Sequence, residues 1–283
     1  MRLKVFYNEN QNVTDNNSIS PSAGKPKLFI DEIKSFPEVE IISDWLPLTR
    51  EDFYLVHDKD HVDAILDCRK ENGFYNYLPS VAQSLYWNNG SFYQAAKEAL
   101  DSSVTCSPTS GFHHAGHLRS LGFCTFNGLM ITAELLKKEK LVDTVGIIDF
   151  DAHYGDGTDN IIQHLELDYI EHKPLYLRSV QNIASWLEVL YDELKNQFSS
   201  CNLLLYQAGA DCHVDDPIGS LGGEGLTTDE MALRDQIVFQ FAYDHSIPIV
   251  WNLAGGYQVP VEIILQLHCN TLKACREVYG LGS

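Results

Sequence analysis

The 283-residue sequence has few basic residues and no paired-cysteine motif. It contains 20 lysines and arginines against 39 aspartates and glutamates, a formal net charge of −19, so we expect no direct binding of nucleic acid. The seven cysteines are scattered, odd in number and never spaced as Cys-x-x-Cys. This pattern argues against a disulfide framework and for a reducing, cytoplasmic environment. The acidic balance favours a cationic or neutral partner, and solubility alone explains it equally well.

Long apolar runs, repeats and low-complexity segments are absent as well. No run reaches the length needed to cross a bilayer, so we expect no membrane partner. The first ten residues, MRLKVFYNEN, lack the apolar stretch of a signal peptide. Because no linker marks a boundary, residues 1–283 are expected to form a single domain with a sizeable core.

Short apolar segments alternate with segments of helical periodicity along the chain. This alternation predicts an α/β protein with one largely parallel β-sheet flanked by helices. The expected strands are 3–7, 39–42, 103–107, 144–150, 174–177, 202–206 and 247–253. The expected helices are 30–36, 60–69, 86–100, 128–140, 160–166, 183–198, 227–243 and 261–279.

Four of the expected strands end in polar or glycine-rich clusters, at 113–117, 149–156, 207–216 and 254–257. The carboxyl ends of parallel strands meet at one edge of a sheet, where ligands of open α/β sheets bind. Each cluster alone is a weak signal, because a tandem histidine, a turn or a helix cap would explain it. Their occurrence after successive strands predicts a common site.

Metal-binding chemistry is concentrated in Asp151, His153 and Asp211. Buried acids need a cation or histidines nearby, and two carboxylates with one imidazole suit a first-row metal such as Zn²⁺. Three protein ligands leave a position for water and substrate, as in catalytic zinc sites. For the acidic segment alone, a helix cap or Asx-turn after a strand is the open alternative.

The remaining polar side chains suit proton transfer and oxyanion binding. His113 and His114 can handle protons, and Asp149 and Asp156 can orient their imidazoles. Tyr257 follows two glycines that allow a sharp turn, and its hydroxyl can donate to a developing oxyanion. The combination predicts metal-assisted hydrolysis of an amide.

Five motifs, in this order, resemble those of the histone deacetylase superfamily, which includes zinc-dependent lysine deacetylases and acetylpolyamine amidohydrolases. The motifs are Gly111–Ala115, Gly122–Asn127, Asp149–Thr158, Ala208–Asp211 with Asp216–Pro217, and Gly255–Tyr257. The resemblance implies an arginase-like α/β domain and zinc-dependent deacylation of an acetylated lysine side chain or a small acetylated amine, with release of acetate.

The resemblance also implies individual roles. It makes Asp151, His153 and Asp211 the ligands of one zinc ion and backbone carbonyls around 149–153 the ligands of a structural K⁺. The remaining roles concern catalysis and substrate. His113 and His114 become the general base and acid paired with Asp149 and Asp156, Tyr257 polarises the carbonyl, and Gly122, Phe123, Ile218, Gly255 and Gly256 contact substrate.

Two regions depart from the family pattern. The chain is short between about 178 and 202, where we find no aromatic and glycine-rich channel wall, and residues 20–26 lie where the first rim loop would be. A shallower site, or one completed in a homo-oligomer, is therefore a hypothesis. At the family's gatekeeper position, Ile218 offers no carboxylate to a polyamine ammonium, which favours acyl-lysine or a small acylamine. The alternative is that Ile218 only packs on its loop.

Three other functions compete with the leading one. An acetylpolyamine amidohydrolase would use the same chemistry on another substrate. A binuclear manganese ureohydrolase would need a further acid after Asp211, where Cys212 and His213 stand instead. A non-catalytic binding module would have no need for the complete set of metal ligands, histidines and tyrosine.

Overall fold

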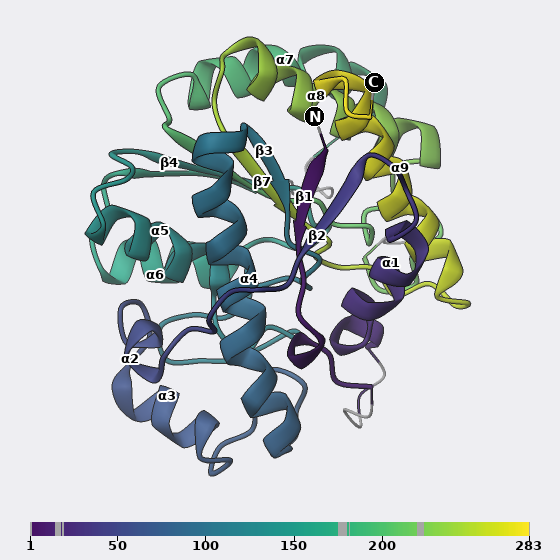
Figure 1. The fold of residues 1–283 in the computed structure, drawn as a ribbon. Helices are drawn as coiled ribbons and strands as arrows, with labels where there is room; N and C mark the ends of the chain where they lie inside the picture. The colour runs from purple at the N-terminus through teal and green to yellow at the C-terminus, as the bar shows by residue number, and fades with distance from the viewer. Residues whose placement is uncertain are drawn as a thin grey trace.

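The computed structural model describes residues 2–14, 18, 20–174, 180, 182–219 and 224–282. Its strands form one sheet in which every pairing is parallel, in the order β2-β1-β3-β7-β6-β4-β5 (Figure 1). The strands are β1 (Leu3–Phe6), β2 (Val39–Ile42), β3 (Val104–Cys106), β4 (Val145–Asp149), β5 (Ile170–Pro174), β6 (Leu203–Gln207) and β7 (Ile249–Asn252). The predicted α/β class with a parallel sheet is confirmed.

Helices cover both faces of this sheet. On one side lie α2 (Arg50–Phe53), α3 (Lys59–Leu66), α4 (Pro79–Ser102), α5 (Gly128–Lys138) and α6 (Asp156–His164) (Figure 1). On the other side lie α1 (Lys25–Ile33), α7 (Ile183–Phe198), α8 (Thr228–Asp244) and α9 (Glu262–Tyr279). Two short 3₁₀ helices, Glu9–Gln11 and Pro21–Ala23, precede α1.

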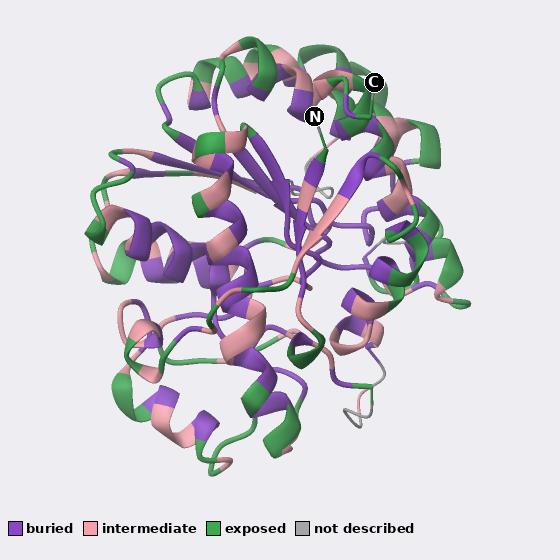
Figure 2. Cartoon of the chain, in the orientation of Figure 1, coloured by how far each residue is buried: buried purple, intermediate pink, exposed green. Residues whose placement is uncertain are grey.

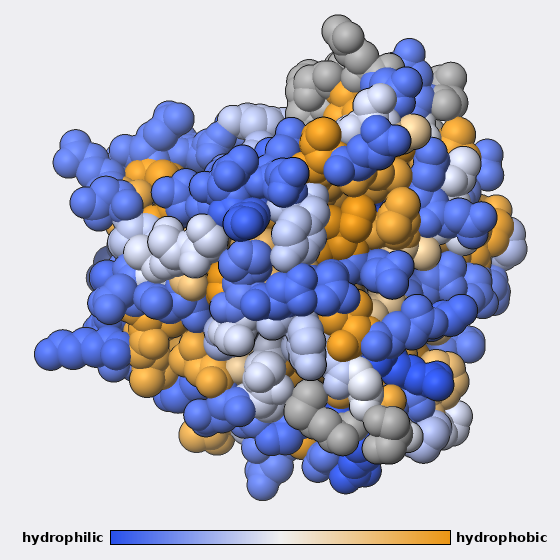
Figure 3. Space-filling view, turned by 90° about the horizontal axis from the view of Figure 1, so that it is seen from above, coloured by the Kyte–Doolittle hydropathy of each residue, from blue (hydrophilic) through white to orange (hydrophobic). Residues whose placement is uncertain are grey.

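The alternation of side chains along the strands explains these two layers. On β6, Leu203 and Leu205 pack in the core beneath α2–α6, whereas Leu204 and Tyr206 pack in the core beneath α7–α9. Successive side chains of a strand point to opposite faces, so a strand covered on both faces reads as a continuous apolar run. Every residue of the central strands β3, β4, β6 and β7 is buried, whereas the edge strands β2 and β5 are buried only in part (Figure 2). The face in Figure 3 is mostly hydrophilic, with separate apolar patches.

Most predicted elements are present, with shifted ends. The capping box that predicted the start of α8 is formed, since Thr227 caps the Glu230 amide and Glu230 accepts from the Thr227 amide. The strand predicted at 174–177 was placed too late, because β5 pairs with β4 over Ile170–Pro174. Residues 175–177 lie outside the described part. Within that part, none of the helices is both long and apolar enough to span a membrane.

Candidate active site

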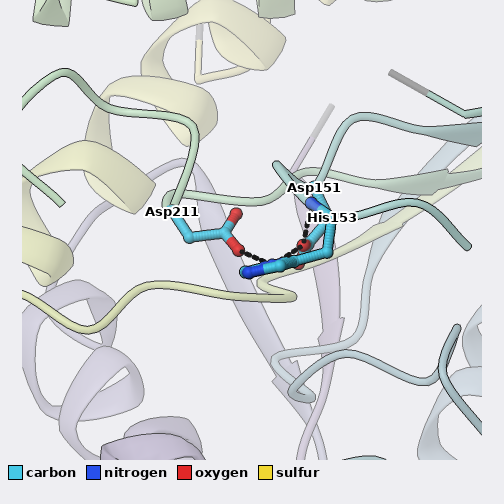
Figure 4. A group of neighbouring side chains, drawn as sticks. All are labelled: Asp151, His153 and Asp211. Carbon is cyan, nitrogen blue, oxygen red and sulfur yellow. Dashed lines mark hydrogen bonds and ion pairs between the residues drawn. The ribbon is translucent and has the colours of Figure 1, made fainter. Parts of the chain in front are cut away.

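The metal-ligand candidates come together at the carboxyl edge of two neighbouring strands. Asp151 and His153 follow β4, and Asp211 follows β6, its partner in the sheet. One potential ligand atom from each of the three lies within 4.8 Å of the others, and the side chains point toward one another (Figure 4). His153 Nδ1 is 3.1 Å from Asp151 Oδ1 and 3.0 Å from Asp211 Oδ2. The geometry thus offers a metal two carboxylates and one imidazole.

Holding these two carboxylates together is unfavourable without a cation. Asp151 and Asp211 are both buried. Burial and the neighbouring Asp151 carboxylate raise the pKa of Asp211 to about 7. Like charges in a site of low dielectric disfavour ionisation of one partner, and a divalent cation removes that repulsion. The donor set therefore suits a metal ion.

Backbone amides fix the carboxylates in place. The Gly255 amide donates to Asp151 Oδ2 at 2.9 Å, and the Ala152 amide donates to Asp211 Oδ1 at 3.0 Å. A Cβ atom on Gly255 would lie 2.5 Å from the Asp211 carboxyl carbon and 2.6 Å from Asp151 Oδ2. Only glycine allows this approach, so Gly255 contributes its backbone to the site.

The tandem histidines lie beside the metal-ligand candidates, each paired with its predicted aspartate. His113 Nδ1 donates to Asp149 Oδ2 and His114 Nδ1 to Asp156 Oδ1, both at 2.7 Å. The two rings are 4.1 Å apart, and His113 Nε2 is 3.6 Å from Asp151 Oδ1. Because each Nδ1 is held by a carboxylate, Nε2 is the atom of each ring that remains for substrate chemistry.

The environments of the two histidines differ. The His113 side chain is 2% exposed, and although burial lowers its pKa, Asp149 and Asp151 raise it to about 9. The His114 side chain is 17% exposed, and burial together with His113 lowers its pKa despite Asp156. The pKa values of these two adjacent imidazoles are thus shifted in opposite directions, upward for His113 and downward for His114.

Aromatic side chains form a wall next to the histidines. Phe123 and Tyr257 have ring centroids 5.6 Å apart, and the Tyr257 amide donates to Asp216 Oδ2 at 2.8 Å. The residue before Phe123, Gly122, has φ +57°, and a Cβ there would lie 2.5 Å from His114 Cδ2. The predicted channel residues are therefore adjacent to the proton-handling pair. Burial raises the pKa of Tyr257, so its hydroxyl keeps its proton.

The predicted gatekeeper lies on the same loop as Asp216. The Ile218 amide donates to Asp216 Oδ1 at 2.9 Å, and the residue is 40% exposed. Among the described residues, Ile218 contacts none of the metal-ligand candidates through a hydrogen bond. Its role toward substrate stays a prediction.

Sequence reasoning missed several residues that support the site. Gln207, the last residue of β6, donates to Asp149 Oδ1 at 2.8 Å and accepts from the Phe112 amide at 3.0 Å. The fully buried Lys25 of α1 contacts the carbonyl oxygens of Ala254, at 2.5 Å, and Gly255, at 3.2 Å. Gln207 lay within the strand-end cluster at 207–216, and Lys25 lay within the segment 20–26 at the expected first rim loop, but no pattern assigned a role to either residue.

A buried parallel sheet whose carboxyl edge holds an Asp–His–Asp cluster beside two His–Asp pairs defines a candidate metallohydrolase site. A family model described as "Histone deacetylase domain" matches residues 26–183, more than half of the 283-residue chain. Histone deacetylase 2 of Arabidopsis thaliana is 26% identical over 257 residues, covering 78% of this chain and 65% of that protein. An uncharacterised protein of Picosynechococcus is 27% identical over 248 residues, and the match covers 80% of this chain and 81% of that protein.

Solved structures share the fold. The HDA15 HD domain has a TM-score of 0.74 at 17% identity and covers 99% of this chain and 89% of its own. An acetylpolyamine aminohydrolase from Burkholderia pseudomallei has a TM-score of 0.74 at 16% identity, and the match covers 98% of this chain and 99% of that chain. The chain belongs to the histone deacetylase family. This membership confirms the expected family, fold and class of enzyme, a deacetylase-type hydrolase.

Proposed function

We propose that this protein is a zinc-dependent amidohydrolase that removes an acetyl or similar acyl group from an amine. The observation that carries the proposal is the meeting of two His–Asp pairs with the Asp151–His153–Asp211 cluster at one sheet edge. Family membership supports hydrolysis of an acyl-amide, and the acidic and imidazole ligands support the metal. We propose one deacetylase-like domain over residues 1–283, and the seven free cysteines support a reducing, cytoplasmic location.

Zinc suits the donor set because two carboxylate oxygens and one imidazole nitrogen are common catalytic zinc ligands, with a further position open. When bound, zinc polarises the substrate carbonyl and lowers the pKa of a coordinated water. A binuclear manganese centre is less well supported. Cys212, next to Asp211, is held by a contact with Arg234, and His213 is hydrogen-bonded to Thr228 and Gln258.

The chain's own residues then manage protons and charge. One ring of the tandem pair accepts a proton from the attacking water at Nε2, and the other donates a proton to the departing amine nitrogen. Asp149 and Asp156 hold the rings so that each Nε2 faces the reacting atoms. The Tyr257 hydroxyl, protonated at neutral pH, donates to the oxygen that gains charge.

The Tyr257→Phe variant tests this assignment. Removing one oxyanion donor should lower kcat by about 10²–10³ while zinc content stays at the wild-type value. Single-turnover kinetics and metal analysis on the same preparation give both numbers. The Tyr243→Phe variant is the matched control, since Tyr243 of α8 is 53% exposed and packs against Tyr279 of α9. Near-normal rates in Tyr257→Phe would remove this residue from the mechanism.

The proposed substrate is an acetylated lysine side chain or a small acetylated amine. Ile218 supports this class over polyamines because it brings no negative charge to an internal ammonium. The decisive experiment measures acetate release by the zinc-loaded protein from an acetyl-lysine peptide and from an acetylated polyamine. A strong preference for the polyamine would favour the acetylpolyamine amidohydrolase alternative. No release from either substrate by protein that retains zinc would contradict the proposed activity.

A further inference from the structure

Arg234 and Asp235 form an ion pair on the buried face of α8, between the apolar side chains of Met231 and Val238. Both charged residues are buried. Arg234 Nε donates to Asp235 Oδ1 at 2.8 Å, and Nη2 lies 2.7 Å from the same oxygen. An ion pair removed from water loses hydration energy, and apolar side chains of similar size often stabilise a fold equally well. The pair therefore calls for a role other than stability.

The guanidinium of this pair reaches the two loops that carry the carboxylates of the candidate metal site. Its Nη1 donates to the carbonyl oxygens of Phe150, at 3.1 Å, and Gly209, at 3.0 Å, and lies 2.8 Å from Cys212 Sγ. Phe150 directly precedes Asp151 in the loop after β4. Gly209 and Cys212 stand on either side of Asp211 in the loop after β6. One buried side chain thus binds both loops next to their metal-ligand candidates.

The two loops are packed directly against each other at this point. A Cβ atom added to Gly209 would lie 2.6 Å from the Cα atom of Asp151 and 2.9 Å from Asp211 Oδ1. The Ala152 amide of the first loop also donates to Asp211 Oδ1 of the second, at 3.0 Å. Because the packing leaves no slack, a shift of the Phe150 or Gly209 carbonyl also moves the carboxylates.

The ion pair is itself fixed by two hydroxyl groups. Asp235 Oδ1 accepts from the Tyr206 hydroxyl of β6, and Asp235 Oδ2 accepts from Thr271 Oγ1 of α9 at 2.5 Å. Both hydroxyl-bearing side chains are buried. Hydrogen bonds to charged groups are strong, and the planar fork of a guanidinium has a defined direction. The network therefore joins β6, α8 and α9 rigidly to the two loops.

We propose that Arg234, oriented by Asp235, is a positioning residue that sets the separation of the Asp151 and Asp211 carboxylates and so the affinity of the site for zinc. It acts through the backbone of the two loops and touches neither carboxylate. The inference rests on the metal site of the proposed function, but it does not depend on the reaction or on the substrate.

The Arg234→Lys variant tests the inference. Lysine keeps the positive charge but lacks the planar fork that binds the Phe150 and Gly209 carbonyls. We expect the zinc Kd of the folded protein, measured by competition with a chromophoric chelator, to rise about 10–100-fold. Arg276→Lys is the matched control, because Arg276 is 53% exposed and pairs with Glu38, and its zinc Kd should equal that of the wild type.

The outcomes separate this inference from the proposed function. An unchanged Kd in Arg234→Lys, beside a wild-type protein that binds zinc, would overturn the positioning role and leave the proposed function intact. A wild-type protein that binds no zinc would refute the proposed metal and this inference with it. The Tm of the metal-free proteins is measured in parallel, since a purely structural role would lower Tm without changing the zinc Kd of folded molecules.

A double variant, Arg234→Met with Asp235→Asn, covers the case in which Arg234→Lys does not fold. It leaves no charge unpaired in the core, and the asparagine still offers hydrogen-bonding groups to Tyr206 and Thr271. Its zinc Kd should again rise about 10–100-fold. A wild-type Kd in this variant would show that the ion pair only fills the core, and would overturn the proposal.

Discussion

Two pairs of histidines in this protein show opposite uses of the same side chain. His113 and His114, at the sheet edge, hold aspartate carboxylates at 2.7 Å. His57 lies just before α3 and His61 lies within it, and among the described residues neither imidazole is hydrogen-bonded to a carboxylate. His57 Nδ1 donates to the Gly116 carbonyl and its Nε2 accepts from the Asn127 amide, both at 2.9 Å. His61 contacts Lys70 and Ser120.

The difference in partners sets the difference in charge. Carboxylates raise the pKa of His113 to about 9 against the effect of burial. For His57 burial dominates and lowers the pKa to about 3. The first environment can hold and transfer protons, whereas the second uses a neutral imidazole as a fixed donor and acceptor. We infer that His113 and His114 act in catalysis, whereas His57 stabilises the fold. His57 does so by hydrogen-bonding Gly116 and Asn127, which lie at the two ends of the loop 116–127.

The largest effect should come from removing an edge histidine. His114→Ala should lower kcat by about 10²–10⁴, because it removes one partner of the proposed proton transfer. Acetate release at saturating acetyl-lysine peptide gives the rate, and zinc content and Tm give the integrity of the fold. His117→Ala is the control, since His117 lies on the same loop but stacks on His164 outside the site. A rate near that of the wild type would place the proton transfer elsewhere.

Removing His57 should lower the stability of the fold and leave the catalytic rate unchanged. His57→Ala leaves a buried cavity, unpairs the Asn127 amide and leaves the Gly116 carbonyl with only the longer bond from the Arg119 amide, at 3.4 Å. These losses should lower the free energy of unfolding by about 2–4 kcal/mol. Urea denaturation measures this loss. His61→Ala, one turn later and bonded only to flexible side chains, should cost about 1 kcal/mol. An equal loss in both variants would contradict the special role of His57, as would a fall in kcat per folded molecule.

A smaller change should follow from altering an aspartate that orients a histidine. Asp156→Asn keeps the shape of the side chain but removes the charge beside His114, so we expect kcat to fall about 10–100-fold with little change in Tm. Asp159→Asn is the control, because Asp159 lies on the same helix but is hydrogen-bonded to His172 and Tyr154 and not to His113 or His114. Equal rate losses in the two variants would mean that the general charge of α6 matters more than its contact with His114.

The edge residues could be predicted from the sequence, because each follows an apolar strand directly. The parallel sheet then brings the clusters at 113–117, 149–156, 207–216 and 254–257 to one edge. The order of the sequence motifs indicated the family. His57 and His172 could not be predicted. Neither belongs to a strand-end cluster, and their partners are 59 and 70 residues away for His57 and 13 residues away for His172. Long-range hydrogen bonds of this kind have no local signature, and β5 was itself placed too late.

The last and smallest effect is the loss of stability at acid pH that follows from the buried, neutral imidazole of His57. The folded-state pKa of His57 is lowered to about 3, below the value of about 6.5 in an unfolded chain, so the unfolded state binds more protons between these limits. The contribution of His57 to stability is therefore complete above pH 6.5 and is lost progressively as the pH falls toward 3. Between pH 7.5 and pH 5 the loss should be about 2 kcal/mol. Urea denaturation of the wild type and of His57→Gln at both pH values measures it, because glutamine does not titrate. The advantage of the wild type over His57→Gln should shrink at pH 5, and an advantage that stayed constant would show that His57 does not remain neutral in the fold.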